Sequence, residues 1–379
     1  MILCVNIDAM GKDEINSSAL VPIVIPSYEP DDRLITLLHA FDEKGMGPVI
    51  IVNDGSSEKY DDIFKEAESI ITKRGGKFIS YRPNRGKGRA LKTAFSYISE
   101  NMPDAIGCVT ADSDGQHSPD CITTIINTLK EHPDNLILGV RQFKKEDIPW
   151  KSWFGNTLTV KVFAYVSGMK VSDTQSGLRG IPYKFMRELI DCKGERFEYE
   201  TQMLLECAGR YGLTEVPIET IYDSKENHQT HFDPFKDSIR IYKILGKKFV
   251  KFIFASLSSF VIDILLFHLF VFLLKDSFAA IYITLATVGA RVISAVYNYL
   301  INYKFVFKSK ASKGTSLTKY ALLAIIQMCL SAGIVTAFVM VFPGSWETLV
   351  KVITDTILFL ISYSVQQRFV FSSKSKNNS

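Results

Sequence analysis

The first part of the chain alternates short apolar runs with longer amphipathic stretches. Four apolar runs predict buried strands, at residues 21–25, 48–52, 78–81 and 106–109. Three stretches with a helical spacing of apolar residues lie between them, at residues 31–41, 60–74 and 90–99. Strands that alternate with helices of this length are typical of a mostly parallel α/β sheet, in which ligands bind at the carboxyl ends of the strands. We therefore expect the polar loops after these runs to face one crevice.

From Phe249 onward the pattern changes to long apolar stretches. Four of them are present, at residues 249–274, 278–301, 319–342 and 349–371. Each has the roughly 20 residues that a helix needs to cross a bilayer. The sequence therefore predicts an α/β domain followed by an all-α transmembrane domain of four helices.

The distribution of charge agrees with this division. The part from Phe249 onward carries 12 Lys+Arg against 4 Asp+Glu, and the part before it carries 32 against 36. A basic excess in the apolar part indicates contact with a membrane surface and not with nucleic acid. Most of these basic residues fall at the same ends of the spans, namely Lys251, Lys304, Lys308, Lys310, Lys313, Lys319, Arg368, Lys374 and Lys376. The positive-inside rule then places these ends, and the α/β domain, in the cytoplasm.

Two carboxylates, Asp112 and Asp114, follow the apolar run that ends at Val109. If they continue a strand, residues at i and i+2 share a face and can point at one small volume. A hard divalent cation is the usual partner of such a pair, and Mg²⁺ or Mn²⁺ typically completes its shell with substrate phosphates. A surface turn built from Asp, Ser and Gly explains this segment equally well when it is taken alone.

Residues 84–89, Asn-Arg-Gly-Lys-Gly-Arg, combine two glycines and three cations with the start of a predicted helix. Free backbone N–H groups and positive charge at a helix start can hold a pyrophosphate, although a loop of this composition can also be merely solvated. Asp54, after the second apolar run, can hydrogen-bond a base or a ribose, or can cap the next helix.

Seven motifs follow one another in the first part of the chain. They are Pro26–Glu29, Val52–Ser57, Asn84–Gly88, Asp112–Gln116, Gly139–Arg141, Asp173–Gly180 and Arg196–Glu200. In this order they resemble the family-2 glycosyltransferases of GT-A fold, and the last three resemble the branch of dolichol-phosphate mannose synthases and GtrB-like enzymes. The resemblance covers about residues 19–245 and implies a GT-A, Rossmann-like catalytic domain at residues 19–226.

The resemblance also implies roles for individual residues. The nucleotide sugar would be bound by Pro26, Tyr28, Glu29, Asp54, Lys87 and Asp112. The divalent metal, Mg²⁺ or Mn²⁺, would be held by Asp112, Asp114 and Gln116. The acceptor phosphate would be contacted by Arg141, Arg179 and Arg240. The catalytic residues would be Asp114, Arg141 and Arg179.

The physical logic of these roles is electrostatic. A lipid phosphate is already an anion, so its attack does not need a strong base. The site must instead bring two negatively charged groups together, which a metal ion and arginines can do. For Asp173, Glu198 and Glu200, ion pairs that order loops explain the sequence as well as a direct role does.

The implied reaction is the transfer of one sugar from a UDP- or GDP-linked donor to a polyprenyl phosphate, such as undecaprenyl phosphate, with inversion at the sugar. The product would be a lipid-phosphate-linked monosaccharide for cell-surface glycosylation. Processive synthases end in Gln-x-x-Arg-Trp, whereas residues 366–369 read Gln-Gln-Arg-Phe, which favours transfer of a single sugar. UDP is mildly favoured over GDP, and glucose, N-acetylglucosamine, mannose and aminosugars are all compatible.

Two further segments precede the first predicted span. Residues 149–166 are aromatic-rich, too short and polar to span, and suited to an interfacial helix, with a core helix as the alternative. Residues 227–248 are expected to form an acceptor loop, in which Asp233 is left unassigned, and a basic juxtamembrane helix with Arg240, Lys243, Lys247 and Lys248.

Residues 249–371 resemble the GtrA-like proteins, which are four-span partners of prenyl-phosphate sugar pathways. The segments Asn302–Phe307 and Gln366–Phe371 are similar and suggest an internal repeat of helix pairs. Asp263 and Arg291 both fall near the predicted midplane, where isolated charges are costly, so we expect them to pair. Such a pair is either structural or lines a path for a lipid-linked headgroup. The alternative function of the domain is therefore to translocate or hand over the lipid-linked sugar.

The remaining expectations concern the ends of the chain and its surroundings. Residues 1–18 are predicted to be a leader and residues 372–379 a cytoplasmic tail. The partners are a nucleotide-sugar donor, a polyprenyl phosphate and the bilayer, and nucleic acid is not expected. A homo-oligomer and a downstream membrane glycosyltransferase are compatible further partners. The expected location is the cell (inner) membrane, as a multi-pass protein.

Overall fold

The structure is a computed structural model of the 379-residue chain. It describes residues 19–141, 150–219, 236–274, 281–307, 309, 311–342 and 347–372. The predicted leader, most of the predicted tail and residues 227–235 of the predicted acceptor loop lie outside these ranges. The chain divides into two compact units, Met1–Lys161 with Lys170–Ile241 and Val162–Met169 with Tyr242–Ser379.

A sheet of seven strands organises the first unit, within the described residues. The strands are β1 (Ile23–Ser27), β2 (Val49–Asp54), β3 (Lys77–Tyr81), β4 (Gly107–Thr110), β5 (Asn135–Arg141), β6 (Arg179–Pro182) and β7 (Gly212–Ile218). Their order is β3-β2-β1-β4-β6-β5-β7. Only the pairings of β6, with β4 and with β5, are antiparallel. The prediction of a mostly parallel α/β sheet is confirmed.

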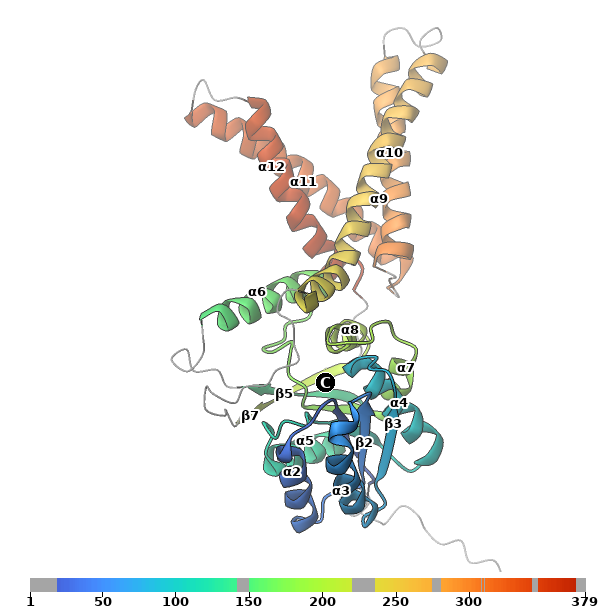
Figure 1. Cartoon of the computed structure of the whole chain (residues 1–379). Helices are drawn as coiled ribbons and strands as arrows, with labels where there is room; N and C mark the ends of the chain where they lie inside the picture. Colours follow the sequence, from blue (N-terminus) through green and yellow to red (C-terminus); the bar gives the residue numbers. More distant parts are fainter. Residues whose placement is uncertain are drawn as a thin grey trace, which may run out of the picture. The chain divides into compact units, whose positions relative to one another are not determined.

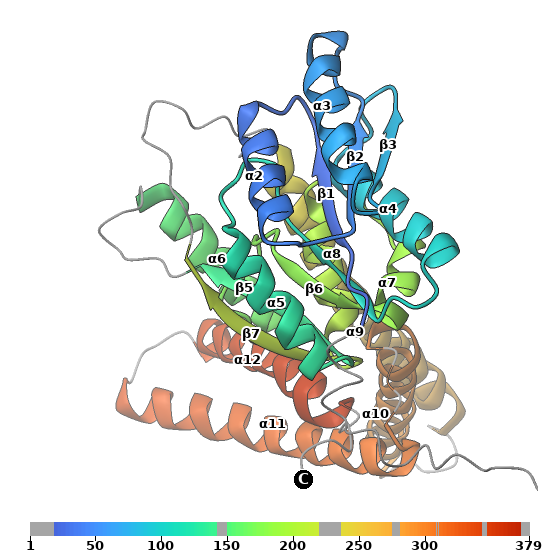
Figure 2. The same ribbon diagram turned by 90° about the horizontal axis from the view of Figure 1, so that it is seen from below.

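Helices cover both faces of this sheet. They are α2 (Asp32–Glu43), η2 (Glu58–Tyr60), α3 (Asp61–Thr72), α4 (Lys87–Asn101), α5 (Pro119–Glu131), α7 (Tyr183–Ile190) and α8 (Glu198–Cys207). Buried residues of α2, α3 and α5 share one apolar cluster with residues of β1, β2 and β4. Helix α4 contacts β1 and β2 from the other side and also contacts α7. Figure 2 shows α2 and α5 on one side of the strands and α4 and α7 on the other.

Helix α2 shows how the sequence builds one of these layers. Asp31 is its N-cap, and the Asp31 side chain accepts a hydrogen bond from the backbone N–H of Arg33. The stripe of Leu34, Leu38 and Phe41, predicted from the spacing, is at most 1% exposed. Burial of each such side chain contributes about 1.5–3 kcal/mol, so the stripe attaches the helix firmly to the sheet.

The strand order predicts where a ligand binds at one edge of the sheet. Consecutive strands run from β1 to β2 and β3 in one direction, whereas β4 lies on the other side of β1. Ligands of open α/β sheets bind outside the carboxyl ends of the strands at such a reversal of order. The loops after β1 and β4 flank the reversal, and the motifs with Tyr28 and Asp112 lie in these two loops.

The second unit is helical in its described residues. Its main elements are α9 (Lys236–Leu274), α10 (Tyr282–Ile301), α11 (Lys313–Val341) and α12 (Glu347–Val365), whose labels appear in Figure 1. The end of α6 (Trp150–Ser167) belongs to the same unit. Two π-helices, η3 (Asn302–Val306) and η4 (Gln366–Val370), follow α10 and α12.

Three helical segments of the described chain are long and apolar enough to cross a membrane, Lys236–Leu274, Lys313–Val341 and Leu349–Val370. Helix α10, with 20 residues, covers most of the second predicted span and is not among these three segments. The predicted basic helix before residue 249 and the predicted first span form one continuous helix, α9. At 1.5 Å per residue, a helix of 39 residues is about 58 Å long, so only part of α9 fits within a bilayer core of about 30 Å.

Aromatic side chains join the segments of the second unit. Tyr165, near the end of α6, has its ring 5.2 Å from that of Tyr363 and 5.9 Å from that of Phe249. The Tyr165 hydroxyl donates to the backbone oxygen of Leu360 at 2.9 Å. The end of α6 therefore packs as a core helix of this unit. The side chains of residues 150–156, on which the interfacial alternative depends, lie outside the described part.

Candidate active site

The loop after β4 carries Asp112, which is contacted by residues from distant parts of the sequence. The ammonium of Lys87 lies 2.6 Å from one Asp112 carboxylate oxygen and 2.8 Å from a carboxylate oxygen of Glu200. The Nε2 atom of His117 lies 3.5 Å from the other Asp112 oxygen. The structure thus brings the Gly-rich loop and the Asp112 loop together, as the strand pattern predicts.

These contacts determine the charge states of the cluster. Burial alone would raise the pKa of Asp112, but the charge of Lys87 and the hydrogen bond from His117 outweigh it and hold the pKa well below its usual value. Burial would likewise lower the pKa of Lys87, but the charges of Asp112 and Glu200 raise it above the usual value. Asp112 is therefore an anion and Lys87 a cation at neutral pH.

Asp114 lies in a different electrostatic environment two residues later. Its pKa is raised, first by burial and then by repulsion from the Asp112 carboxylate. One of its oxygens accepts a hydrogen bond from the backbone N–H of Gln116 at 3.1 Å. Strand β4 ends at Thr110, and Gly115 has a φ of 73°. The strand does not continue to Asp112 and Asp114, and a turn, the alternative considered for this segment, brings the two carboxylates near each other.

The donor set of this turn fits a hard divalent cation. Among the residues that the structure describes, no group of three or more His, Cys, Asp and Glu side chains is arranged to hold a metal by itself. Asp112, Asp114 and Gln116 offer two carboxylates and an amide oxygen, so other oxygen ligands would have to complete the coordination. A cation beside Asp114 would also remove the repulsion that raises its pKa.

Asp54 organises the Gly-rich loop from the end of β2. Its carboxylate accepts hydrogen bonds from the backbone N–H groups of Arg85 and Gly86, at 2.9 and 2.8 Å, and from the hydroxyl of Tyr81 at 2.8 Å. The side-chain amide of Asn84 donates to it at 3.0 Å. Asp54 is only 3% exposed. The structure therefore shows Asp54 as the residue that orders the loop carrying Lys87.

The loop after β1 is joined to the loop after β2. The backbone N–H of Glu29 donates to the hydroxyl of Ser56 at 2.8 Å, and Glu29 has a positive φ of 48°. Pro26 lies in β1 opposite Val52. Partial burial and the charge of Glu29 raise the pKa of Tyr28, which keeps its hydroxyl protonated. The loop that carries Tyr28 and Glu29 therefore contacts the loop that follows Asp54.

Gly177 lies against Asp112 from the segment before β6. A Cβ atom added to Gly177 would lie 2.3 Å from one Asp112 carboxylate oxygen and 2.6 Å from the other. The backbone oxygen of Gly177 accepts a hydrogen bond from the hydroxyl of Thr110 at 2.7 Å. Only a residue without a side chain leaves room for the carboxylate here.

Arg141, at the end of β5, forms a two-pronged contact with Asp173. Its Nε and a terminal nitrogen donate to the two Asp173 carboxylate oxygens at 2.7 and 3.1 Å. Asp173 is 0% exposed, and it also accepts from the backbone N–H of Gln175 at 2.9 Å. This geometry supports the alternative in which Asp173 orders a loop. It also orients Arg141, whose side chain is 22% exposed.

Arg179 is placed differently from the expectation. It is 1% exposed, and its guanidinium donates to the backbone oxygens of Ser176, Glu200 and Thr174 at 2.9, 2.6 and 3.3 Å. Donors that are used inside the protein are not offered to a phosphate. In this structure Arg179 supports the segment next to Asp112, and the expected direct contact with an acceptor phosphate is not supported by its position.

The predicted acceptor side is described only in part. Arg240, in the first turns of α9, pairs with Asp237 at 2.7 Å, and its side chain is 44% exposed. The polar loop before it, including Asp233, lies outside the described residues.

The sequence assigned no role to His117 or Glu195, and for Glu200 it left open whether the residue forms an ion pair or acts directly. His117 is 3% exposed beside Asp112, and Glu200 holds Lys87. Glu195 binds Arg89 and Lys92 of α4 at 2.6 and 3.0 Å. Glu195 and Glu200 bind cations of α4 that are distant in sequence, so local patterns could not reveal these contacts, whereas His117 follows Asp112 by only five residues.

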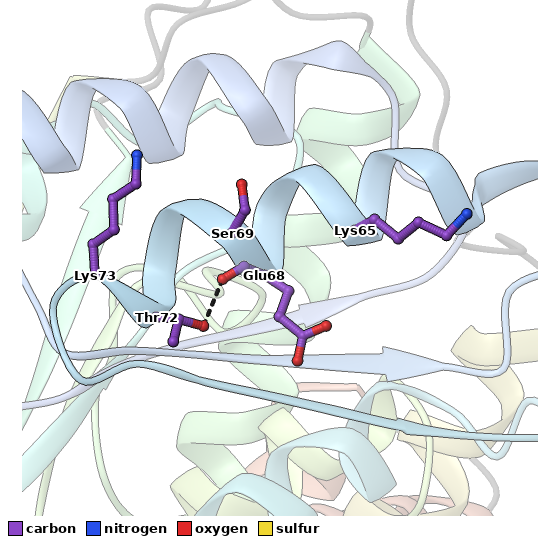
Figure 3. Close-up of a pocket in the computed structure, with 5 residues that line it drawn as sticks. All are labelled: Lys65, Glu68, Ser69, Thr72 and Lys73. Atoms are coloured by element: carbon purple, nitrogen blue, oxygen red, sulfur yellow. Dashed lines mark hydrogen bonds between the residues drawn. The ribbon is translucent and has the colours of Figure 1, made fainter.

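A surface hollow of about 590 Å³ lies elsewhere in this unit, along α3. Figure 3 shows its lining residues, Lys65, Glu68, Ser69, Thr72 and Lys73. All belong to one exposed helix and its C-cap, and the hydrogen bond drawn there, from the Thr72 hydroxyl to the Glu68 backbone oxygen, is a local contact of 2.7 Å. The hollow brings no groups together for chemistry, so the candidate site remains at the strand ends.

The mostly parallel seven-stranded sheet with helices on both faces has the GT-A architecture. Residues 23–204 match the family model described as glycosyl transferase family 2, and residues 251–371 match the GtrA/DPMS transmembrane domain. The chain therefore contains a glycosyl transferase family 2 domain, which is followed by a GtrA/DPMS transmembrane domain. It is a membrane protein.

Similar proteins include a dolichol-phosphate mannosyltransferase of Pyrococcus furiosus, 22% identical over 93% of this chain and 99% of the relative. A UDP-N-acetylglucosamine--dolichyl-phosphate N-acetylglucosaminyltransferase of Methanococcus voltae is 27% identical over 54% of this chain and 86% of the relative. Among solved structures, a mannosyltransferase of Pyrobaculum calidifontis in complex with GDP-Man and Mn²⁺ is 15% identical, with a TM-score of 0.37 and coverage of 92% and 87%.

Proposed function

We propose that this protein transfers one sugar from a nucleotide sugar to a polyprenyl phosphate at the cytoplasmic face of the cell membrane. The observation that carries the proposal is the presence, in one chain, of the Asp112–Lys87–Asp114 cluster at the sheet reversal and of a GtrA/DPMS transmembrane domain. The two relatives above support it, because both of their names include a dolichyl or dolichol phosphate.

The donor would occupy the crevice between the loops after β1 and β4. Tyr28 and Glu29 lie in the first loop, Pro26 lies near the end of β1, and Asp54 holds the Gly-rich loop in place. Lys87 is charged and its side chain is only 16% exposed. Its attraction for a phosphate oxygen is therefore screened less than it would be in bulk water. Both UDP- and GDP-linked sugars remain candidate donors.

Asp112, Asp114 and Gln116 would hold a Mg²⁺ or Mn²⁺ ion together with the diphosphate. When bound, the ion supplies positive charge to the departing nucleoside diphosphate. The protein's own contribution is to fix the two carboxylates and to keep Asp112 ionised through Lys87 and His117.

The acceptor phosphate would attack the anomeric carbon from the side opposite the diphosphate. A bond forms between that carbon and an acceptor phosphate oxygen, the bond to the diphosphate oxygen breaks, and the configuration inverts. The nucleophile is already an anion, so no base is required. Arg141, oriented by Asp173, would attract the acceptor phosphate, and Arg179 would support the site from within.

Transfer of labelled sugar to lipid tests the proposal directly. Membranes containing the protein are incubated with undecaprenyl phosphate, Mn²⁺ or Mg²⁺ and a panel of labelled UDP- and GDP-sugars. One donor should give a lipid-linked product, and Asp114→Asn should reduce its formation by about 10²-fold or more. Asp120→Asn, which changes an exposed carboxylate on α5, should leave the rate unchanged. Absence of product with every donor would overturn the proposal.

Removal of metal tests the ion separately. An excess of EDTA should stop transfer, and added Mn²⁺ or Mg²⁺ should restore it. The far-ultraviolet circular dichroism should not change, because the sheet is held by its apolar core. Full transfer in EDTA would contradict the metal assignment while leaving the reaction itself in place.

A further inference from the structure

The membrane domain holds an arginine that its surroundings do not explain. Arg291 is the tenth residue of the twenty in α10, so it lies about 15 Å from either end of the helix. Its side chain is 72% exposed, although α10 belongs to the transmembrane domain. A charged group at this depth is costly unless it faces a partner, a water-filled space or a bound anion.

Asp263, the predicted partner of Arg291, engages only part of the hydrogen-bonding capacity of the Arg291 guanidinium. A terminal nitrogen of Arg291 lies 3.5 Å from a carboxylate oxygen of Asp263 on α9, so the expected pair forms. The other Asp263 oxygen accepts a hydrogen bond from the hydroxyl of Ser294 at 2.8 Å. Asp263 is 17% exposed and is therefore held by the protein, whereas most of the donors of Arg291 make no hydrogen bond within the described chain.

The second helix pair provides an internal comparison. Arg291 lies eleven residues before η3, and Asp355 lies eleven residues before η4. At Asp355 both carboxylate oxygens are satisfied, one by the Ser331 hydroxyl at 2.5 Å and the other by the Lys351 ammonium at 2.9 Å. Lys351 also donates to Ser331 at 3.1 Å. The equivalent cluster of the second pair is thus closed, and only the first leaves a cation with free donors.

We propose that Arg291 binds the phosphate of a polyprenyl-phosphate lipid inside the membrane domain, at a site separate from the catalytic crevice. A guanidinium with free donors matches phosphate oxygens in geometry and charge. Bulk phospholipid headgroups lie at the membrane surface, about 15 Å from the midplane, whereas a lipid phosphate that moves through the domain passes this depth. The inference rests on the proposed function, which places such a lipid in the same membrane.

Lipid counting on the full-length protein tests this site. Native mass spectrometry in detergent measures how many undecaprenyl phosphates bind to each chain without donor. Wild type should bind two, one in the crevice and one at Arg291. Arg291→Ala should bind one and keep the wild-type rate of sugar transfer. Arg291→Lys should retain the second lipid with lower affinity, and Lys351→Ala, the matched change in the other helix pair, should still bind two.

The outcomes separate the inference from the proposed function. One lipid on both wild type and Arg291→Ala, with transfer intact, overturns the inference alone. Equal occupancy by undecaprenol or phosphatidylglycerol overturns it too, as does a dimer that Arg291→Ala dissociates. If no variant binds the lipid and none transfers sugar, the proposed function is overturned as well. If Arg291→Ala does not fold, Arg291→Gln, which retains hydrogen-bonding donors toward Asp263, takes its place in the same comparison.

Discussion

At the scale of single residues, the chemistry of this protein centres on Asp112. Lys87, His117 and Gly177 reach it from three segments, and each controls a different property of the carboxylate. Lys87 keeps it charged, His117 binds its second oxygen, and Gly177 leaves the room that it occupies. A metal-binding carboxylate must be both ionised and correctly oriented, so all three contribute to the site.

Lys87 is the first residue to test. Lys87→Met keeps the length of the side chain but leaves Asp112 and Glu200 without their cation. We expect the rate of sugar transfer to fall by about 10²-fold or more, because a fixed positive charge beside the diphosphate is lost. Steady-state assays measure this, and Lys73→Met, on the exposed end of α3, is the control. A wild-type rate for Lys87→Met would show that Lys87 only holds the loops together.

Gly177 tests the fit around Asp112. In Gly177→Ala the new methyl group would meet the Asp112 carboxylate at 2.3 Å, so the carboxylate or the loop has to move. A misplacement of a catalytic group by about 1 Å can reduce the rate by about 10²-fold. Gly246→Ala, where an added Cβ meets nothing within 4 Å, should transfer sugar at the wild-type rate. Equal rates for the two variants would contradict the close contact.

At the scale of elements, the membrane domain is joined by polar side chains on apolar helices. Gln327 of α11 donates to the backbone oxygen of Leu358 on α12 at 3.0 Å and accepts from the Ser362 hydroxyl at 3.1 Å. Ser331 continues this contact toward Asp355. Apolar surfaces give little preference for one helix partner in lipid, so hydrogen bonds of this kind help to specify the pairing.

Ser331 therefore offers a test of the α11–α12 pair. Ser331→Ala removes the hydrogen bond to Asp355 without changing the backbone. We expect a loss of about 0.6 kcal/mol and at most about 1.7 kcal/mol, the range of such bonds in membrane proteins. Thermal unfolding in detergent, followed by circular dichroism, measures the loss. Thr356→Val, which removes a hydroxyl bonded only within α12, should have a smaller effect, and the reverse order would contradict this assignment.

At the scale of the whole molecule, the distribution of charge predicts the orientation in the membrane. The basic ends of the spans should lie on the same side as the catalytic domain because positive residues are retained in the cytoplasm.

Cysteine labelling checks that orientation. In a background without native cysteines, Lys73→Cys on α3 should react with a membrane-impermeant maleimide only in inverted vesicles. Ser277→Cys, between the first two predicted spans, should react only in right-side-out vesicles. Labelling of both positions from one side would contradict the predicted orientation.

Much of this architecture follows from the sequence alone. Alternating apolar runs specify buried strands and amphipathic helices, because burying those side chains is the main source of stability. Long apolar stretches specify membrane helices for the same reason. The motifs with Tyr28, Asp54, Lys87 and Asp112 could be placed in advance at the carboxyl ends of strands, because an α/β sheet leaves its polar loops there.

Only the tertiary structure decided what each polar side chain contacts. The turn at Gly115, the burial of Arg179 and the contact between Lys87 and Glu200 depend on segments that are distant in sequence, and a local pattern contains no information about such partners. The same holds in the membrane domain, where the sequence predicted that Asp263 and Arg291 would pair. The structure confirms this pair and adds that Asp263 also accepts a hydrogen bond from Ser294, whereas most donors of Arg291 make no hydrogen bond within the described residues. The position of α9 against α10 determines which of these groups can meet.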